Sequence, residues 1–244
     1  GTLLMAMPQV PKAKESYERL VRLYPDKSDP LYVLADIYLR MDSVDACLQM
    51  LDRMEEIDGL NPQITQSKFY VLQEAGRIEE GFEAYRKLIA QHPYDVRIRL
   101  QLGDLQMQNA QIEQAKQTYD EAAVIDPDNA YVWVAQANYY SMTGNQAEAD
   151  KLVSGALMNA NLDVETKNEV MTEYLKGTYR KLSNYRQQSE QDNVTAELDT
   201  LALFKSIDSL FAQVSAMHPT SPEFYELHAQ WLNTQDKDSL AAEC

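Results

Sequence analysis

Apolar residues recur along this chain of 244 residues at helical spacing, in pairs of segments separated by short turns. The turns contain residues that break a helix or redirect it, such as Gly76, Ala110 and Gly144. Two antiparallel helices per pair follow from this pattern. The hydrophobic periodicity therefore predicts an all-α fold built from consecutive helix pairs.

The helix pairs recur with a period of 34 residues, and the same residue types return at the same columns of each block. The predicted blocks are a partial one at 1–27 and full ones at 28–61, 62–95, 96–129 and 130–163. Column 20 is small in each block, and it holds Ala13, Cys47, Gly81, Ala115 and Ala149. A small residue there lets the second helix approach the first closely. Proline or a residue that tolerates a left-handed cap stands at column 32 and ends each second helix: Pro25, Gly59, Pro93, Pro127 and Asn161.

The block at 164–221 is longer than the others by about 24 residues, and a truncated block follows at 222–244. Within the longer block, the stretch Leu182–Val194 is polar, which predicts a loop flanked by helices longer than those elsewhere. We expect this pair to project past the edge of the stacked helices. Two interpretations of the insertion at 183–194 stay open: a tolerated surface insertion, because loop closure entropy grows slowly with length, or a second contact site.

These columns resemble the tetratricopeptide repeat. The block at 96–129 carries the family's residue types at most signature columns: Leu102, Gly103, Ala115, Tyr119, Ala122 and Asp126–Asn129. The resemblance covers essentially the whole chain and implies a right-handed superhelical solenoid of about six repeats. Gln106 replaces the usual aromatic residue at column 11, and Phe69 and Met171 replace small residues at column 8. These departures predict a different crossing angle or distance in the helix pairs concerned.

The resemblance also implies a binding surface, because the first helices of such repeats line a concave face through columns 2, 5, 9, 12 and 13. The residues that we select there for partner binding are Tyr32, Asp36, Tyr70, Arg97, Asp104, Tyr131 and Asn138. Aromatic side chains are strong anchors at interfaces, and the polar ones can bond a partner's backbone. The alternative is that the tyrosines only pack against neighbouring first helices.

Members of the family that bind the C-terminal carboxylate of heat-shock chaperones use a clamp of Lys, Asn and Arg residues. At the corresponding columns this chain has Tyr32, Asp36, Ser67, Arg97 and Gln101, of which only Arg97 has the right charge. The clamp is therefore absent. A basic or neutral protein or peptide segment is the expected ligand.

The formal net charge is −16, which disfavours nucleic acid because phosphate would be repelled. Acidic residues are concentrated in the block at 28–61, so a basic partner would be steered toward it. A solvated convex face explains that charge equally well. The apolar stretches are far shorter than the ~20 residues that a membrane-spanning helix needs, so no membrane insertion is expected.

No combination of residues in the sequence points to catalysis. The three histidines and two cysteines lack metal-ligand spacing, and the eight glycines form no phosphate-binding loop. Cys47 stands at column 20, where a thiol packs as a small hydrophobe. We therefore predict no catalytic residues, no metal, no cofactor and no enzymatic activity.

The sequence thus predicts a protein–protein interaction module that binds a peptide or helix of a partner in the concave groove. The alternative is a structural spacer or a scaffold that associates with itself through exposed repeat ends. Gly1 begins no signal peptide, and residues 238–244 resemble the opening of a helix. We therefore expect the chain to be part of a longer protein, whose compartment and partner the sequence does not identify.

Overall fold

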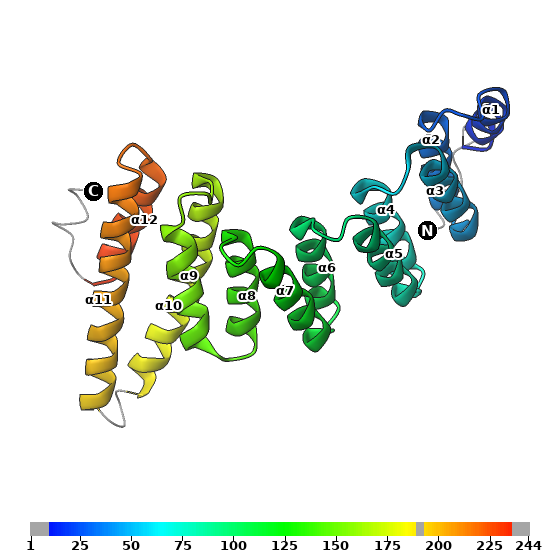
Figure 1. The fold of residues 1–244 in the computed structure, drawn as a ribbon. Helices are drawn as coiled ribbons and strands as arrows, with labels where there is room; N and C mark the ends of the chain where they lie inside the picture. The colour runs from blue at the N-terminus through cyan, green and yellow to red at the C-terminus, as the bar shows by residue number, and fades with distance from the viewer. Residues whose placement is uncertain (1–9, 189–192, 236–244) are drawn as a thin grey trace. The chain divides into compact units, whose positions relative to one another are not determined.

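The computed structural model describes residues 10–188 and 193–235, and every regular element within these ranges is an α-helix (Figure 1). The twelve helices are α1 (Val10–Leu23), α2 (Asp29–Arg40), α3 (Val44–Asp58), α4 (Pro62–Glu74), α5 (Ile78–Gln91), α6 (Val96–Gln108), α7 (Ile112–Ile125), α8 (Ala130–Met142), α9 (Gln146–Met158), α10 (Val164–Gln188), α11 (Asn193–Met217) and α12 (Pro222–Asn233). The all-α fold predicted from the periodicity is confirmed. Residues 1–9, 189–192 and 236–244, including the expected helix opening at 238–244, lie outside the described ranges.

The start of the first helix in each pair follows from local sequence signals. Helices α4, α6, α8 and α10 begin at residues 62, 96, 130 and 164, each 34 residues after the one before. The side chains of Asn61 and Asn129 cap two of them by accepting bonds from the backbone N–H groups of Ile64, at 3.1 Å, and Tyr131, at 3.0 Å. Pro62 is at the start of α4, where a backbone N–H has no partner within the helix. Proline has no N–H to leave unpaired there, and its ring fixes φ near the helical value.

In four helix pairs, from α2 and α3 to α8 and α9, the turn places one residue in the left-handed region, at column 15 of the block. These residues are Asp42 (φ 58°), Gly76 (φ 72°), Ala110 (φ 59°) and Gly144 (φ 85°). At the end of α4, the N–H of Arg77 bonds the carbonyl of Leu72 at 2.7 Å, and that of Gly76 bonds the carbonyl of Gln73 at 3.0 Å. This pair of bonds is a Schellman cap, which satisfies the last carbonyls of α4 and turns the chain back.

The chain divides into two compact units, with unit 1 ending at Leu105 and unit 2 beginning at Gln106. The core of unit 1 contains one cluster around Leu31, Leu34 and Leu51 and another around Phe69, Phe82 and Tyr85. Each cluster joins the two helices of a pair to the helix that follows. Unit 1 is thus held together by apolar packing between consecutive helices.

Phe69 at column 8 is accommodated by a complementary change at column 20. A Cβ built on Gly81 would stand 2.8 Å from Cδ2 of Phe69 and 3.4 Å from its Cα. Phe69 is fully buried, with its ring centroid 5.2 Å from that of Phe82 and 5.9 Å from that of Tyr85. The absence of a side chain at residue 81 therefore makes room for the large one on the facing helix.

Unit 2 contains a second compensated departure, at column 11. Gln106 is 3% exposed, and the hydroxyl of Thr118 on α7 donates a hydrogen bond of 2.7 Å to its Oε1 atom. A buried amide is tolerated when such a partner is present. The main cluster of unit 2 joins α9, α10, α11 and α12 around Phe211, Phe224 and Trp231, which are all fully buried.

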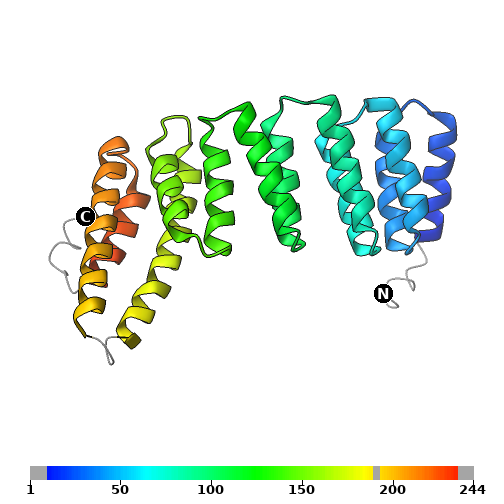
Figure 2. The ribbon, with the colours of Figure 1, turned by 60° about the horizontal axis from the view of Figure 1, so that its bottom comes forward.

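The prediction of a loop over Leu182–Val194 is wrong for most of its length. Helix α10 continues to Gln188 and α11 begins at Asn193, so that both helices have 25 residues whereas the others have 12 to 15. The stretch contains neither glycine nor proline, and Arg and Gln are good helix formers, so its polarity is compatible with a solvated helix. As expected, the flanking helices are the long ones, and within unit 2 the pair extends past the ends of α8 and α9 (Figure 2).

Candidate functional site

The seven residues selected from the sequence all lie on first helices, and all are exposed. In unit 1, Tyr32 and Asp36 lie on α2, Tyr70 on α4, and Arg97 and Asp104 on α6; in unit 2, Tyr131 and Asn138 lie on α8. The exposed fractions of the tyrosines are 60% for Tyr32, 47% for Tyr70 and 43% for Tyr131. Each therefore presents part of its ring to solvent.

Two of the charged candidates in unit 1 are engaged by neighbours in the sequence. Asp36 accepts a bond of 2.7 Å from Nε of Arg40, one helical turn further on. Arg97 pairs with Asp95 at 3.0 Å, and this guanidinium lowers the pKa of the Asp95 carboxyl. The Asp36–Arg40 pair and the guanidinium of Arg97 are exposed, whereas Asp95 is partly buried, so both pairs are weak and can exchange partners readily.

In unit 2, Tyr131 takes part in a helix cap. Its hydroxyl donates a bond of 2.7 Å to Oδ2 of Asp163, whose Oδ1 accepts from the backbone N–H of Thr166 at 2.8 Å. These bonds, first the one from the Thr166 backbone, lower the pKa of Asp163 to about 2. Tyr131 therefore serves the start of α10 with its hydroxyl, while part of its ring stays exposed.

Tyr32 lines a hollow of unit 1. This "Tyr32 hollow" has a volume of about 270 Å³ and is formed by α2, the end of α3 and the start of α4. Its lining residues are Ser28, Asp29, Tyr32, Leu51, Met54, Asp58, Asn61, Gln63, Ile64 and Ser67. Two of them are acidic and none is basic, so the hollow suits a positively charged group with an apolar stem.

The Tyr32 hollow combines residues that the sequence analysis selected or considered with others that it missed. Asp29, Tyr32 and Gln63 stand at columns of the concave face, whereas Asp58 and Asn61 lie at the end of α3 and in the turn before α4. Asp58 and Asn61 reach the hollow because that turn lies close to α2 in the folded chain. Only columns of the first helices were considered from the sequence, so these two residues could not be selected. The lining of this hollow does not include the other six selected residues.

A larger hollow of unit 1, of about 600 Å³, lies among α3, α4 and α5 and shares no lining residue with the Tyr32 hollow. We call it the "Lys68 hollow". Its lining residues are Asp45, Leu48, Gln49, Asp52, Glu55, Leu60, Lys68, Leu72, Arg77, Glu80, Glu83, Ala84 and Lys87. Five are acidic and three are basic, in contrast to the Tyr32 hollow, which has no cation.

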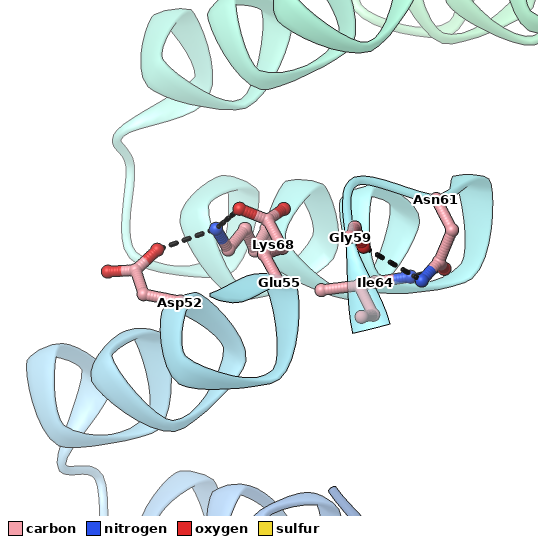
Figure 3. A network of polar contacts seen from close by, with 6 residues as sticks. All are labelled: Asp52, Glu55, Gly59, Asn61, Ile64 and Lys68. Carbon is pink, nitrogen blue, oxygen red and sulfur yellow. Dashed lines mark hydrogen bonds and ion pairs between the residues drawn. The ribbon is translucent and has the colours of Figure 1, made fainter. Parts of the chain in front are cut away.

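Two of the three basic residues of the Lys68 hollow, Lys68 and Arg77, are each held by carboxylates of two side chains. Lys68 on α4 forms ion pairs with Asp52 and Glu55 of α3, and its ammonium group stands between them (Figure 3). Arg77 likewise bonds Asp45 of α3 and Glu80 of α5, each at 2.7 Å. These contacts connect one helix pair to the next by charge-assisted bonds.

Lys68 was missed in the sequence analysis, although a signal was present. It stands at column 7, where the neighbouring blocks have Leu34 and Leu102 in the core. A lysine at a core column needs a carboxylate nearby, because an unpaired buried ammonium is strongly disfavoured. Asp52 and Glu55, at the end of the preceding block, were the carboxylates that could have been predicted to pair with Lys68.

The described residues hold no group of three or more His, Cys, Asp or Glu side chains arranged for a metal ion. Nor does any helix in the described ranges have the length and apolarity that are needed to cross a membrane.

Comparison with known proteins places one part of the chain in a family. Residues 72–139 match the family model described as tetratricopeptide repeat. In an alignment 154 residues long, which covers 58% of this chain, the sequence is 27% identical to cellulose synthase operon protein C of Pseudomonas fluorescens (strain SBW25). This chain spans only 12% of the length of that relative.

Several solved structures resemble the chain at low identity. PilF of Pseudomonas aeruginosa is 14% identical with a TM-score of 0.44, and the match covers 91% of this chain and 99% of PilF. MamA of Desulfovibrio magneticus RS-1 is 14% identical with a TM-score of 0.43, over 62% of this chain and 85% of MamA. YrrB, described as a TPR protein with an unusual peptide-binding site, is 14% identical with a TM-score of 0.42, over 65% of this chain and 82% of YrrB.

Proposed function

This chain is a tetratricopeptide repeat protein, and from that premise we propose that it binds a partner polypeptide through unit 1, where the Tyr32 hollow receives a basic side chain of the partner. Proteins built from such repeats are in general interaction modules and non-enzymatic scaffolds. The specific site and the charge of the ligand are the parts that we add.

The composition of the Tyr32 hollow is the observation that carries the proposal. Asp29 and Asp58 both line it, and no lysine, arginine or histidine does. Two carboxylates without a cation leave acceptor capacity that a lysine or arginine of a partner can use. The hollow is also large enough for one such side chain, and its volume lies just below the range usual for sites that enclose a whole small ligand.

The apolar part of the lining supports the same ligand class. Leu51 and Met54 belong to the buried core, and they contribute apolar lining to the same hollow as the exposed Tyr32. The long aliphatic stem of lysine or arginine packs well on such a surface while its charged end reaches a carboxylate. A peptide backbone lying across α2 and α4 can also bond the amide of Gln63.

The test is a screen of the purified chain against a peptide library in which each position is varied in turn. We expect wild-type protein to select lysine or arginine at one position, and we expect this selection to be lost in Tyr32→Ala and in the double variant Asp29→Asn, Asp58→Asn. Tyr94→Ala is the matched control, because Tyr94 is 83% exposed in the same unit and does not line the hollow.

The proposal is wrong if the wild-type chain shows no preference for a basic residue, or if Tyr94→Ala weakens binding as much as Tyr32→Ala. Circular dichroism of each variant checks that the helices are intact. Neither outcome depends on the identity of the natural partner, and the comparison of Tyr32→Ala with Tyr94→Ala is specific to this hollow.

A further inference from the structure

We propose that the Lys68 hollow is a second docking surface, which binds a basic amphipathic segment of a partner protein. It is formed mainly by the second helices α3 and α5, whereas the Tyr32 hollow opens beside the first helices α2 and α4. The two surfaces share no lining residue, so each can be tested without altering the other.

The charges of the Lys68 hollow lie in two layers. The side chain of Lys68 is only 9% exposed and that of Arg77 is 38% exposed, so these cations lie low in the hollow. Three of the carboxylates around them are more open, at 83% for Asp45, 62% for Asp52 and 57% for Glu80, whereas Glu55 is 17% exposed. Lys87 of the lining is exposed as well, but the exposed carboxylates outnumber the exposed cations, so a partner approaching from solvent meets mainly negative charge and the surface attracts positive charge.

The exposed carboxylates keep acceptor capacity after pairing with the cations beneath them. Asp45 uses Oδ1 for Arg77, and Asp52 uses Oδ1 for Lys68. The second oxygen of Asp52 points away from Lys68 (Figure 3). An ionised carboxylate accepts about four hydrogen bonds, so each of these groups can bond an arginine or lysine of a partner without releasing its internal cation.

An apolar strip accompanies the carboxylates. Leu48 of α3, Leu60 of the following turn and Leu72 of α4 line the same hollow, and Ala84 contributes from α5. Leu48, Leu60 and Ala84 are partly exposed, whereas Leu72 is buried. Aliphatic lining beneath a carboxylate rim fits a segment with leucine-like residues on one face and basic residues on the other.

The experiment measures binding of a synthetic helical peptide with arginines on one face and leucines on the other, by fluorescence anisotropy. The full chain carries Tyr32→Ala, Asp29→Asn and Asp58→Asn, so that the Tyr32 hollow does not contribute. Into this background we introduce Asp45→Asn with Asp52→Asn, which leaves Arg77 paired with Glu80 and Lys68 paired with Glu55. The fold is thereby kept while the exposed charge is removed.

We expect the double substitution to weaken binding by about fivefold or more, since two exposed ion pairs are lost. The matched control is Glu113→Gln with Glu121→Gln, which removes two exposed carboxylates from α7 of unit 2 and should leave the affinity unchanged. A peptide with glutamates in place of the arginines should not bind.

Three outcomes would overturn the proposal. The arginine peptide fails to bind the background protein, the control pair weakens binding as much as the pair in the hollow, or the glutamate peptide binds equally well. None of these outcomes bears on the Tyr32 hollow, which is inactivated throughout this experiment.

Discussion

Replacing Gly81 by alanine places a methyl group against Phe69, and we expect this substitution to destabilise unit 1. The new Cβ would stand 2.8 Å from Cδ2 of the ring and 3.4 Å from Cα and Cε2 of the same residue. Contacts below 3.0 Å between carbon atoms are repulsive, so something must move. The ring has no free space to move into, because Phe69, Phe82 and Tyr85 are all fully buried in one cluster.

Two opposing effects set the size of the change. Overpacking a dense core costs about 1–3 kcal/mol. Alanine in a helix interior is favoured over glycine by about 1 kcal/mol. We therefore expect Gly81→Ala to lower the free energy of unfolding by about 1 kcal/mol, within a range of about 0–2 kcal/mol.

Gly177→Ala is a control that isolates the packing effect. Gly177 lies inside α10, and a Cβ there meets no heavy atom within 4 Å. This variant should stabilise by about 1 kcal/mol through helix propensity alone. The two substitutions should thus differ by about 1–3 kcal/mol in urea denaturation followed by circular dichroism.

A double-mutant cycle with Phe69→Leu completes the test. A smaller side chain at residue 69 leaves room for the methyl group, so Gly81→Ala should destabilise less, or should stabilise, in the Phe69→Leu background. The reasoning is refuted if Gly81→Ala stabilises wild-type protein as much as Gly177→Ala does. It is also refuted if the effect of Gly81→Ala is the same with Phe69 and with leucine at that position.

Three further predictions concern a turn, an ion pair and a titrating contact. Ala110→Gly should stabilise by up to about 1 kcal/mol in thermal denaturation, because alanine is disfavoured at φ 59°; a loss of stability would contradict this. Lys68→Met should destabilise by about 1–3 kcal/mol because Glu55 loses its cation, and adding Glu55→Leu should restore most of the loss in the same assay. Nζ of Lys167 lies 3.0 Å from Nε2 of His218. Burial and this nearby ammonium lower the pKa of His218 below 6.5. The stability of the protein should therefore be complete above pH 6.5 and fall as the pH drops through the lowered pKa. His218→Gln should reduce this dependence in melts between about pH 7.5 and 5.5, and an unchanged profile would contradict the assignment.

Much of the fold could be predicted because the structural signals are local. The small residues at column 20, such as Cys47 and Ala115, are buried in helix pairs, and the turns redirect the chain at Gly76 and Gly144. The loop predicted around Ser183 was wrong because polarity alone does not distinguish a solvated helix from a loop. The helix-forming composition of that stretch, without glycine or proline, was the better signal.

The candidate site could be predicted only in part. Tyr32 follows from its column on a first helix, but the approach of Asp58 depends on how the end of α3 meets α2. The ion pairs of Lys68 likewise join residues of different blocks. Aligning the blocks by column shows which positions are equivalent, but it does not show which residues of two neighbouring blocks are in contact. Relations between blocks are therefore the part that needed coordinates.

The bonds of Lys68 have a consequence for how such a gene can change by duplication or deletion of a block. The fit of Phe69 to Gly81 lies within one block and would travel with it to any position. Lys68, in contrast, finds Glu55 only if the block at 28–61 stands directly before its own. Excising the block at 28–61, or moving either block away from the other, would leave the buried ammonium of Lys68 without Glu55, so these two blocks need to stay adjacent and in this order.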